Sequence, residues 1–131
     1  MKKLHQLTEL QLTIMDVLWR RKEATVVDVH EAIAERTGLA RKTVGTLVSR
    51  LEQQGLLTHR EEGREYVYRP TVSRSEVGRA TVHNIFANLF PGDLPALVSH
   101  ALEADEIRPG DLERVRELLD DWERRKHTGD R

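Results

Sequence analysis

The sequence of 131 residues contains no cysteine. This absence excludes disulfides, zinc sites with thiolate ligands and cysteine nucleophiles, and it fits a reducing compartment. No apolar run approaches the roughly 18 residues of a membrane-spanning helix, and the first residues, MKKLHQLTEL, lack the apolar segment of a signal peptide. We therefore expect a soluble, cytoplasmic protein without membrane insertion.

Enzyme motifs are missing as well. His30 begins a segment that resembles the zinc-protease motif HExxH, but Ala34 occupies the place of the second ligand. No two histidines stand three or four residues apart, and there is no GxSxG elbow, phosphate-binding glycine loop or dinucleotide fingerprint. Asp120, Asp121 and Glu123 fit a solvated charged surface better than a cation site. We expect no enzymatic activity, no cofactor and no metal site.

The chain also lacks a large excess of one charge, since its formal net charge is -1. The two halves nevertheless differ. Residues 1–70 hold 12 basic and 10 acidic side chains, whereas residues 71–131 hold 9 basic and 12 acidic ones. Because local field rather than total charge steers association, a polyanionic partner would meet the first half.

One stretch, Leu39–Leu57, has the pattern of an amphipathic helix with a defined end. Apolar residues recur from Val44 to Leu51 at i, i+3, i+4 and i+7, which predicts one buried face, and Gly55 favours a helix stop. Cations and short hydroxyls on the other face suit phosphates and base edges, although a face that is merely solvated has the same pattern. These polar residues are Arg41, Lys42, Thr43, Thr46, Ser49 and Arg50.

Two shorter helices are predicted before this stretch. Thr8 and Gln11 have the spacing of a capping box, which places a helix start near Thr8. The same spacing recurs at Thr25, ahead of a helix over Val26–Arg36 that Gly38 should end. Because only a short turn separates this helix from the next, the pair resembles a helix-turn-helix, whose second helix lies in the major groove.

A hairpin should follow the amphipathic helix that Gly55 ends. Leu57–Arg60 and Glu65–Arg69 are short strand-like runs around the charged turn 61–64. Tyr66 and Tyr68 alternate onto one face, which we expect to pack on the helices. The side chains expected to remain available outside are Arg60, Arg64 and Arg69. Residues 1–70 are thus predicted to form a mainly helical α+β domain, a three-helix winged helix-turn-helix with a two- to three-stranded wing.

Residues 71–131 are predicted to form three more helices. Ser73 and Glu76 have capping-box spacing, Asp93 caps the second helix, and Pro109 begins the third. So few residues would make a poor core alone, so their apolar stripes should meet a second copy of the chain in a symmetric homodimer. The predicted dimerisation residues are Ile85, Phe86, Leu89, Leu94, Leu97, Val98, Leu102, Val115, Leu119 and Trp122.

Three segments carry a resemblance to the BlaI/MecI penicillinase-repressor family. They are IMDVLW ending at Trp19, KTVGTLVSRLEQQG from Lys42 to Gly55, and Tyr66-Val67-Tyr68 in the wing. Members of that family are winged-helix repressors that bind operator dyads in double-stranded DNA as homodimers and dimerise through their C-terminal helices. The resemblance covers nearly the whole chain and implies a transcriptional repressor on a palindromic operator.

The resemblance also implies roles for single residues. Lys42, Thr43 and Thr46 would face the major groove, Arg41 and Arg50 would hold phosphates, and Arg64 would serve the wing. Gly45 departs from the pattern, because many members have a larger or charged residue there that is aimed at the DNA. The base preference of the better-known operators is therefore not carried over.

Repression in this family is often relieved when a membrane sensor system triggers proteolysis in the dimerisation region. The best-known members are cut at an Asn-Phe bond, where this chain has His100-Ala101. The departure leaves the inducing signal open. Copper-responsive relatives carry a C-terminal cysteine cluster, and the lack of cysteine excludes that thiolate chemistry here.

Two alternatives to a repressor fit the same residues. The glutamates of the wing and the near-neutral total charge also suit a winged-helix module that binds protein. A regulator that senses a metal or ligand through His83, His100 and acidic neighbours is the other alternative.

Overall fold

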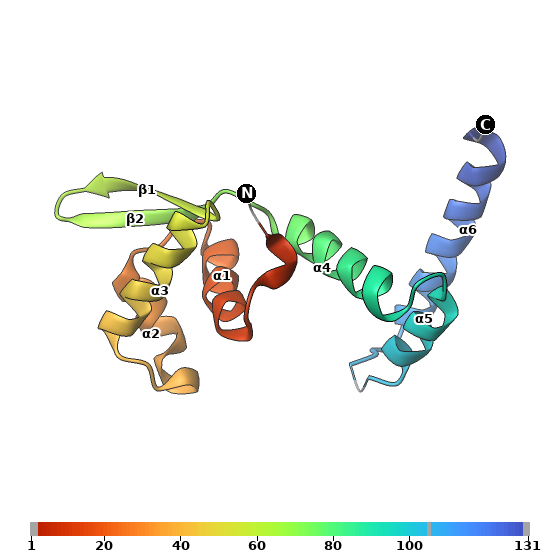
Figure 1. The fold of residues 1–131 in the computed structure, drawn as a ribbon, viewed down its shortest axis with the longest axis horizontal. Helices are drawn as coiled ribbons and strands as arrows, with labels where there is room; N and C mark the ends of the chain where they lie inside the picture. The colour runs from red at the N-terminus through yellow and green to blue at the C-terminus, as the bar shows by residue number, and fades with distance from the viewer. Residues whose placement is uncertain (1–2, 105, 130–131) are drawn as a thin grey trace. The chain divides into compact units, whose positions relative to one another are not determined.

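The computed structural model describes residues 3–104 and 106–129, which form two compact units (Figure 1). The first unit extends to Asn88 and the second begins at Leu89. The elements in chain order are η1 (Leu4–Gln6), α1 (Glu9–Arg21), α2 (Val26–Thr37), α3 (Arg41–Gln53), β1 (Leu57–Glu62), β2 (Glu65–Pro70), α4 (Arg74–Leu89), α5 (Leu94–Leu102) and α6 (Asp111–Gly129). None of the helices in these described ranges has the length and apolarity needed to cross a bilayer.

The predicted starts of the first two helices are confirmed. The Thr8 hydroxyl accepts a hydrogen bond from the Gln11 backbone N–H at 3.1 Å, and the Gln11 side-chain oxygen accepts one from the Thr8 backbone N–H at 3.0 Å. Thr25 and Asp28 make the same reciprocal pair at the start of α2. Helix α2 ends at Gly38, whose φ of 68° lies in the left-handed region that glycine adopts without strain. These contacts depend only on local spacing.

Helix α3 is shorter than the predicted span. It covers Arg41–Gln53, and the chain reverses at Gly55, where φ is 85°. The Leu56 N–H donates to the Leu51 carbonyl at 3.0 Å, which satisfies a carbonyl at the helix end. Leu57, predicted as the first residue of the first strand, begins β1 opposite Pro70. The glycine stop and the start of the strand at Leu57 are therefore both confirmed.

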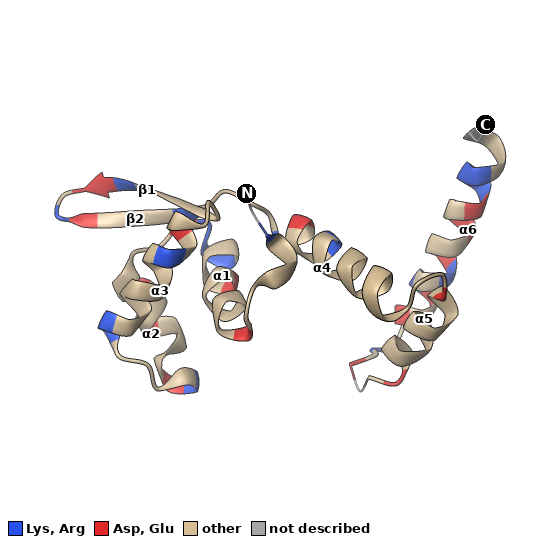
Figure 2. Cartoon of the chain, viewed as in Figure 1, with Lys and Arg blue, Asp and Glu red and all other residues tan. Residues whose placement is uncertain are grey.

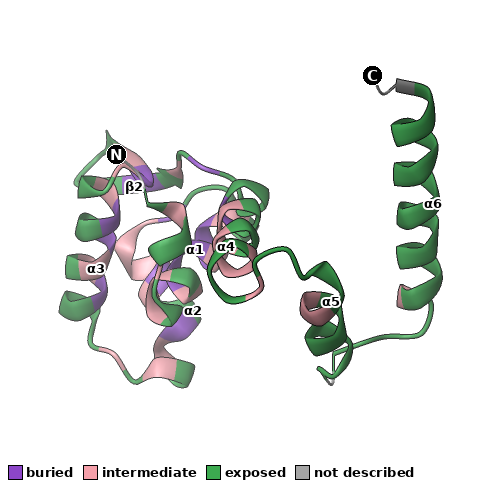
Figure 3. Cartoon of the chain, turned by 45° about the vertical axis from the view of Figure 1, so that its right-hand side comes forward, coloured by how far each residue is buried: buried purple, intermediate pink, exposed green. Residues whose placement is uncertain are grey.

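A single apolar core holds the first three helices together. Figure 3 shows the buried segments of α1, α2 and α3 turned toward one another. The side chains with less than 2% of their surface exposed are Ile14, Met15 and Leu18 from α1, Val29 and Ile33 from α2, and Val44, Val48 and Leu51 from α3. Because each helix contributes a stripe at helical spacing, the core fixes how all three are rotated about their axes.

The hairpin is the predicted wing. Strands β1 and β2 pair antiparallel around the two-residue turn Gly63-Arg64, and both are longer than expected. Gly63 supplies the positive φ, 65°, that this turn requires. Ala24 adds a one-residue bridge on the other side of β2, since its N–H and carbonyl bond the carbonyl and N–H of Tyr68 at 2.9 and 2.8 Å. Three helices followed by this sheet form a winged helix.

Helix α4 is attached to this first unit. Val72 and Val77 are buried in the same core as the three helices, and the Trp19 indole N–H donates to the Val72 carbonyl at 2.9 Å. The predicted capping box of Ser73 and Glu76 is present. The compact unit thus continues beyond residue 70, and the assignment of residues 71–131 to dimerisation stays a prediction.

The second unit contains α5, with 9 residues, and α6, with 19, and neither helix has a buried side chain among the described residues. Asp93 caps α5 as predicted, accepting a hydrogen bond from the Ala96 N–H at 3.1 Å. Helix α6 begins at Asp111 rather than at Pro109, and the Asp111 carboxylate accepts from the Arg108 N–H at 2.8 Å. Figure 3 shows almost all of both helices as exposed.

Asp16 offers a test of the packing between α1 and α4. The Arg74 guanidinium, which hydrogen-bonds Asp16, is the main cause that lowers the pKa of this carboxyl below 3.8, with Arg20 contributing further and partial burial opposing. Because the pKa of Asp16 is lower in the folded state, its charge stabilises the fold at pH values above the pKa of the unfolded state. This stabilisation is lost as the pH falls through the lowered pKa of the folded state. We expect Asp16→Asn to lower the free energy of unfolding near neutral pH by about 1 kcal/mol or less, because the pair is partly exposed.

The measurement is urea unfolding of both proteins at one protein concentration. The difference between them should shrink as the pH is lowered from about 5 toward about 2. A difference that stays constant over this range would show that the charge of Asp16 does not contribute.

Candidate nucleic-acid interface

The outer face of α3 gathers the predicted DNA-binding residues of that helix. Lys42, Thr46 and Arg50 follow one another at intervals of four residues, so they lie along one side of the helix. All three are exposed, as are Arg41 and Thr43. Figure 2 shows the basic segments of α3. On the opposite side of the helix, Val44, Val48 and Leu51 are buried in the core. The polar residues therefore point toward solvent.

The cations of this face are free of acidic partners within the structure. Among residues 3–104 and 106–129, no carboxylate forms an ion pair with Arg41, Lys42 or Arg50. The Thr46 hydroxyl donates to the Lys42 carbonyl at 3.2 Å, which leaves its oxygen able to accept. An uncompensated row of cations beside hydroxyl groups suits a phosphate backbone and base edges.

Gly45 is not required by close packing. A Cβ atom at this position would meet only Val26 Cγ1, at 3.7 Å, an ordinary contact distance. Gly45 therefore lies where α3 faces α2, and the space beside it could hold a small side chain. Its absence of a side chain leaves the surface beside Thr46 bare.

The prediction for the wing tyrosines was half wrong. Tyr68 is 7% exposed and packs in the core, but Tyr66 is 46% exposed. Both rings lie on the same face of the hairpin, and Tyr66 stacks on His59 with ring centroids 4.1 Å apart. The alternation of the sequence thus predicted correctly that the two rings share a face of the hairpin. Tyr66 is nearer the turn, however, and lies beyond the part of that face that is buried.

His59 joins the wing to α3. Its Nδ1 lies 2.6 Å from Oε2 of Glu52, near the end of that helix. The pKa of the Tyr68 phenol is raised, mainly because the group is buried. The nearby charge of Glu52 and then Tyr66 raise it further. This cluster holds the base of the hairpin against the helix that carries the basic face.

Arg60 is not the available cation that the sequence suggested. Its guanidinium donates two hydrogen bonds to the Glu23 carboxylate, at 2.7 and 3.1 Å, and two to Glu62, at 3.0 and 3.3 Å. The Arg60 hydrogen bond is the main cause that lowers the pKa of Glu23, and the two carboxylates raise the pKa of Arg60. Its charge is therefore compensated within the protein.

Arg64 and Arg69 remain exposed, as predicted. Arg64 occupies the hairpin turn and lines an open hollow together with Tyr66, the N-cap residue Thr25 and the first residues of α2, Val26 and Val27. No ion pair engages Arg64 within the described part of the chain. The wing thus offers an uncompensated cation at its tip, and Arg60 is neutralised farther back.

The histidines proposed for metal sensing do not form a common site in either unit. His83 belongs to α4 in the first unit and His100 to α5 in the second. His100 Nδ1 lies 3.7 Å from Glu103, and its ring is next to Phe90. Over the described ranges, no three histidine, aspartate or glutamate side chains gather closely enough to hold a metal ion.

Comparison with known proteins decides the family. The sequence profile described as "Penicillinase repressor" matches residues 7–121. The chain belongs to the penicillinase repressor family. The penicillinase repressor of Bacillus licheniformis is 27% identical over 126 residues, which cover 96% of this chain and 98% of that protein. The transcriptional regulator BlaI of Mycobacterium tuberculosis is 40% identical over 78 residues, covering 59% and 56%.

Solved structures confirm the predicted fold. The solution structure of the DNA-binding domain of the repressor BlaI matches with a TM-score of 0.51 and 32% identity, covering 58% of this chain and 93% of that one. The monomeric form of Bacillus licheniformis BlaI, solved with the blaP half-operator, has a TM-score of 0.50 at the same identity and coverage. The chain is therefore a winged-helix protein, and the family to which it belongs consists of transcriptional repressors rather than enzymes.

The ion pairs of Arg60 with Glu23 and Glu62 should prevent its charge from contributing to nucleic-acid affinity. In the double variant Glu23→Gln and Glu62→Gln, Arg60 loses both charged partners and becomes free to bind a phosphate. We expect tighter binding to duplex DNA and a plot of log affinity against log salt that is steeper by about 1. Binding is measured by fluorescence anisotropy over a range of salt concentrations.

Glu61→Gln is the matched control for this variant. It removes a carboxylate from the same strand, but Glu61 forms no ion pair with Arg60. If the control raises affinity as much per charge removed as the double variant does, the effect is general repulsion and Arg60 has no special part.

Proposed function

We propose that the protein is a transcriptional repressor that binds a palindromic operator as a homodimer, with α3 of each copy in the major groove. The observation that carries the proposal is the outer face of α3, where exposed cations without acidic partners lie opposite a fully buried apolar stripe. The relative whose structure contains the blaP half-operator shares the fold of this unit, which supports a DNA ligand. A DNA ligand also supports the expected cytoplasmic location.

Different residues of the face have different proposed roles. Lys42, Thr43 and Thr46 contact base edges, because they lie near the start of α3 and recognition helices approach bases with their N-terminal residues. Arg41 and Arg50 hold phosphates on either side of the groove, and Arg64 reaches the backbone from the wing. The phosphate contacts supply affinity and register, whereas the base contacts supply sequence preference.

Substitutions should separate these two roles. Lys42→Ala or Thr46→Ala should weaken binding to the best duplex from a random pool by about 1–3 kcal/mol and weaken random duplexes less. Arg50→Ala should weaken both kinds of duplex alike and reduce the salt slope by about 1. Anisotropy titrations with both duplexes at several salt concentrations measure the two effects.

Arg116→Ala is the control for loss of one positive charge, since Arg116 is an exposed residue of α6 in the second unit. It should leave both affinities nearly unchanged. Equal losses on specific and random duplexes for Lys42, Thr46 and Arg50 variants would contradict the division between base and phosphate contacts.

The second unit is proposed to form the dimer. Its helices α5 and α6 line an open apolar groove with side chains that a single copy leaves uncovered. Leu118, which lines this groove, is 67% exposed, and farther along α6 Leu119 is 57% and Trp122 54% exposed. Exposed apolar surface of this extent is typical of an interface, and a second copy of the chain presents the same surface by symmetry. Ile85, Phe86 and Leu97 are partly covered, and the other predicted dimerisation residues are exposed.

Glutamine substitutions on the two sides of α6 test this interface. Val115 and Leu119 are four residues apart on its apolar side, and Glu113 and Glu117 have the same spacing on its polar side. We expect Val115→Gln with Leu119→Gln to raise the dimer dissociation constant by about 100-fold or more, because apolar surface of both copies loses its burial.

Sedimentation equilibrium measures the dissociation constant. The control, Glu113→Gln with Glu117→Gln, introduces the same side chains on the opposite face and should leave the dimer intact. A monomeric wild-type protein, or equal effects of the two pairs, would contradict the proposed interface.

We further propose that the repressor is released by proteolysis in the dimerisation region, by a protease that acts under a membrane sensor system. The pair His100-Ala101 is exposed near the end of α5, a helix of 9 residues. A cut there would separate the DNA-binding unit from α6. Mass spectrometry of the protein from induced cells would locate the cut, and recovery of only the intact chain from such cells would contradict this route.

A further inference from the structure

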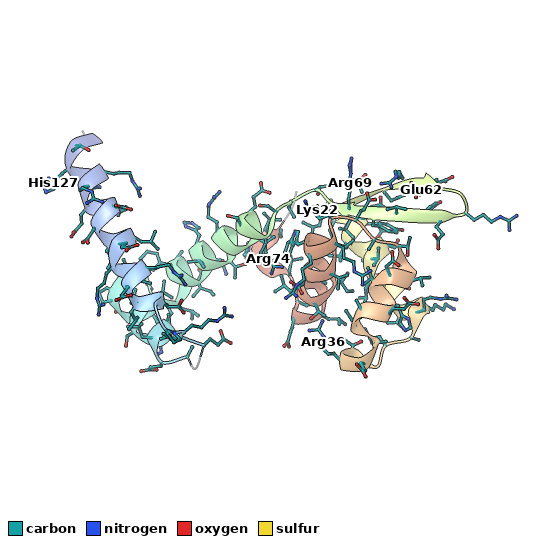
Figure 4. All side chains as sticks on the ribbon, turned by 180° about the vertical axis from the view of Figure 1, so that it is seen from behind. Lys22, Arg36, Glu62, Arg69, Arg74 and His127 are labelled. Carbon is teal, nitrogen blue, oxygen red and sulfur yellow. The ribbon has the colours of Figure 1, made fainter. Side chains whose placement is uncertain are left out.

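Three side chains join α4 to the winged helix at its first turn. Arg74 donates from Nη2 to the Asp16 carboxylate of α1, and its guanidinium lies 4.9 Å from the centre of the Trp19 ring. Asp16 also accepts a hydrogen bond from Arg20 at 3.1 Å, so its position is fixed from two sides. Figure 4 shows Arg74 where α4 begins, beside α1. We call Asp16, Trp19 and Arg74 the α1–α4 cluster.

The backbone around the cluster is held as well. The Trp19 indole N–H donates to the Val72 carbonyl, just before α4, and Val72 is 6% exposed. One turn into the helix, Val77 is 4% exposed and the last residue of α4 with a buried side chain. A hydrogen bond just before the helix, the ion pair of Arg74 and the packed Val77 together attach the start of α4 to the winged helix, and Arg74 and Val77 lie on the same side of its first turn.

The rest of α4 continues from this attached turn to the end of the first unit at Asn88. The helix has 16 residues and therefore a length of about 24 Å. A small change of angle at the cluster is magnified at the far end, where the chain enters the second unit at Leu89. Helix α4 thus has the geometry of a lever whose base belongs to the DNA-binding unit.

From this geometry we infer that the α1–α4 cluster sets the half-site spacing that the dimer recognises. Asp16 and Arg74 are positioning residues, which touch no base and act through the direction of α4. The inference rests on the proposed function, since half-site spacing has meaning only for a dimer on a two-fold operator. It assigns specificity to residues outside the groove, because the distance and helical phase between half-sites depend on how the two DNA-binding units are held.

The test compares operators that differ only in spacing. Duplexes carry two copies of the half-site selected by the wild-type protein, separated by its preferred spacer or by one with one, two or five added base pairs. Half a turn of DNA is about 5 base pairs, so the longest insertion places the half-sites on opposite faces. The full-length proteins are wild type, Arg74→Ala, Asp16→Asn and Arg79→Ala, each also titrated with a single half-site.

Arg79→Ala is the matched control. It removes one positive charge from an exposed position of α4, and Arg79 has no ion pair among the described residues. We expect Arg74→Ala and Asp16→Asn to bind the single half-site as wild type does, which also reports that the winged helix is folded. Their preference for the original spacer over the spacers lengthened by one or two base pairs should fall about fivefold. The control should keep the wild-type preference.

Each outcome decides a different claim. If both cluster variants bind the half-site normally and keep the full spacing preference, the inference is wrong and the proposed function stands. If the variants lose half-site affinity as much as operator affinity, the cluster is structural and does not set spacing. If the wild-type dimer itself shows no spacing preference, both the inference and the two-fold operator are contradicted.

Discussion

The burial of one side of α3 is the constraint on which the site depends. Val44, Val48 and Leu51 are fully buried against side chains of α1 and α2. Turning the helix about its axis would expose these residues and bury Lys42 or Arg50, which is costly in both directions. The core therefore fixes which residues face outward. The capping boxes of α1 and α2 support this arrangement by fixing where the neighbouring helices begin.

The electrostatic design is local. The net charge is -1, and several arginines are compensated within the fold, as Arg60 is by Glu23 and Glu62. Within the described residues, the cations of α3 and Arg64 at the wing tip have no such partners. A field concentrated on few residues restricts attraction to one face, whereas a generally basic surface would hold any polyanion in many orientations. Neutralised arginines near the site thus contribute to discrimination as well as to stability.

Features set by local spacing could be predicted from the sequence. The helix starts at Thr8 and Thr25, the stop at Gly38 and the turn at Gly63 depend on residues close in the chain, and the structure contains all four. The outward face of α3 also follows from periodicity alone. The start of the wing follows in the same way, because the strand-like run after the Gly55 stop begins at Leu57, which pairs with Pro70.

Contacts between distant residues could not be predicted. Nothing in the sequence links Arg60 to Glu23 or Arg74 to Asp16, because each pair is joined only by the folded chain. The alternation of Tyr66 and Tyr68 showed that they share a face, but not where the helices beneath that face end. The same limit applies to α4, whose attachment to the winged helix depends on Val77 reaching a core built by other elements.

Selection from random double-stranded DNA tests the central claim most directly. The purified protein would be immobilised, and the duplexes retained at moderate and at high salt would be sequenced. Two symmetric half-sites about one helical turn apart would establish a dimer that recognises sequence through α3. Retention without any shared motif would reduce the basic face to a general polyanion surface. No retention at either salt would contradict DNA binding and favour a protein ligand for the same helix.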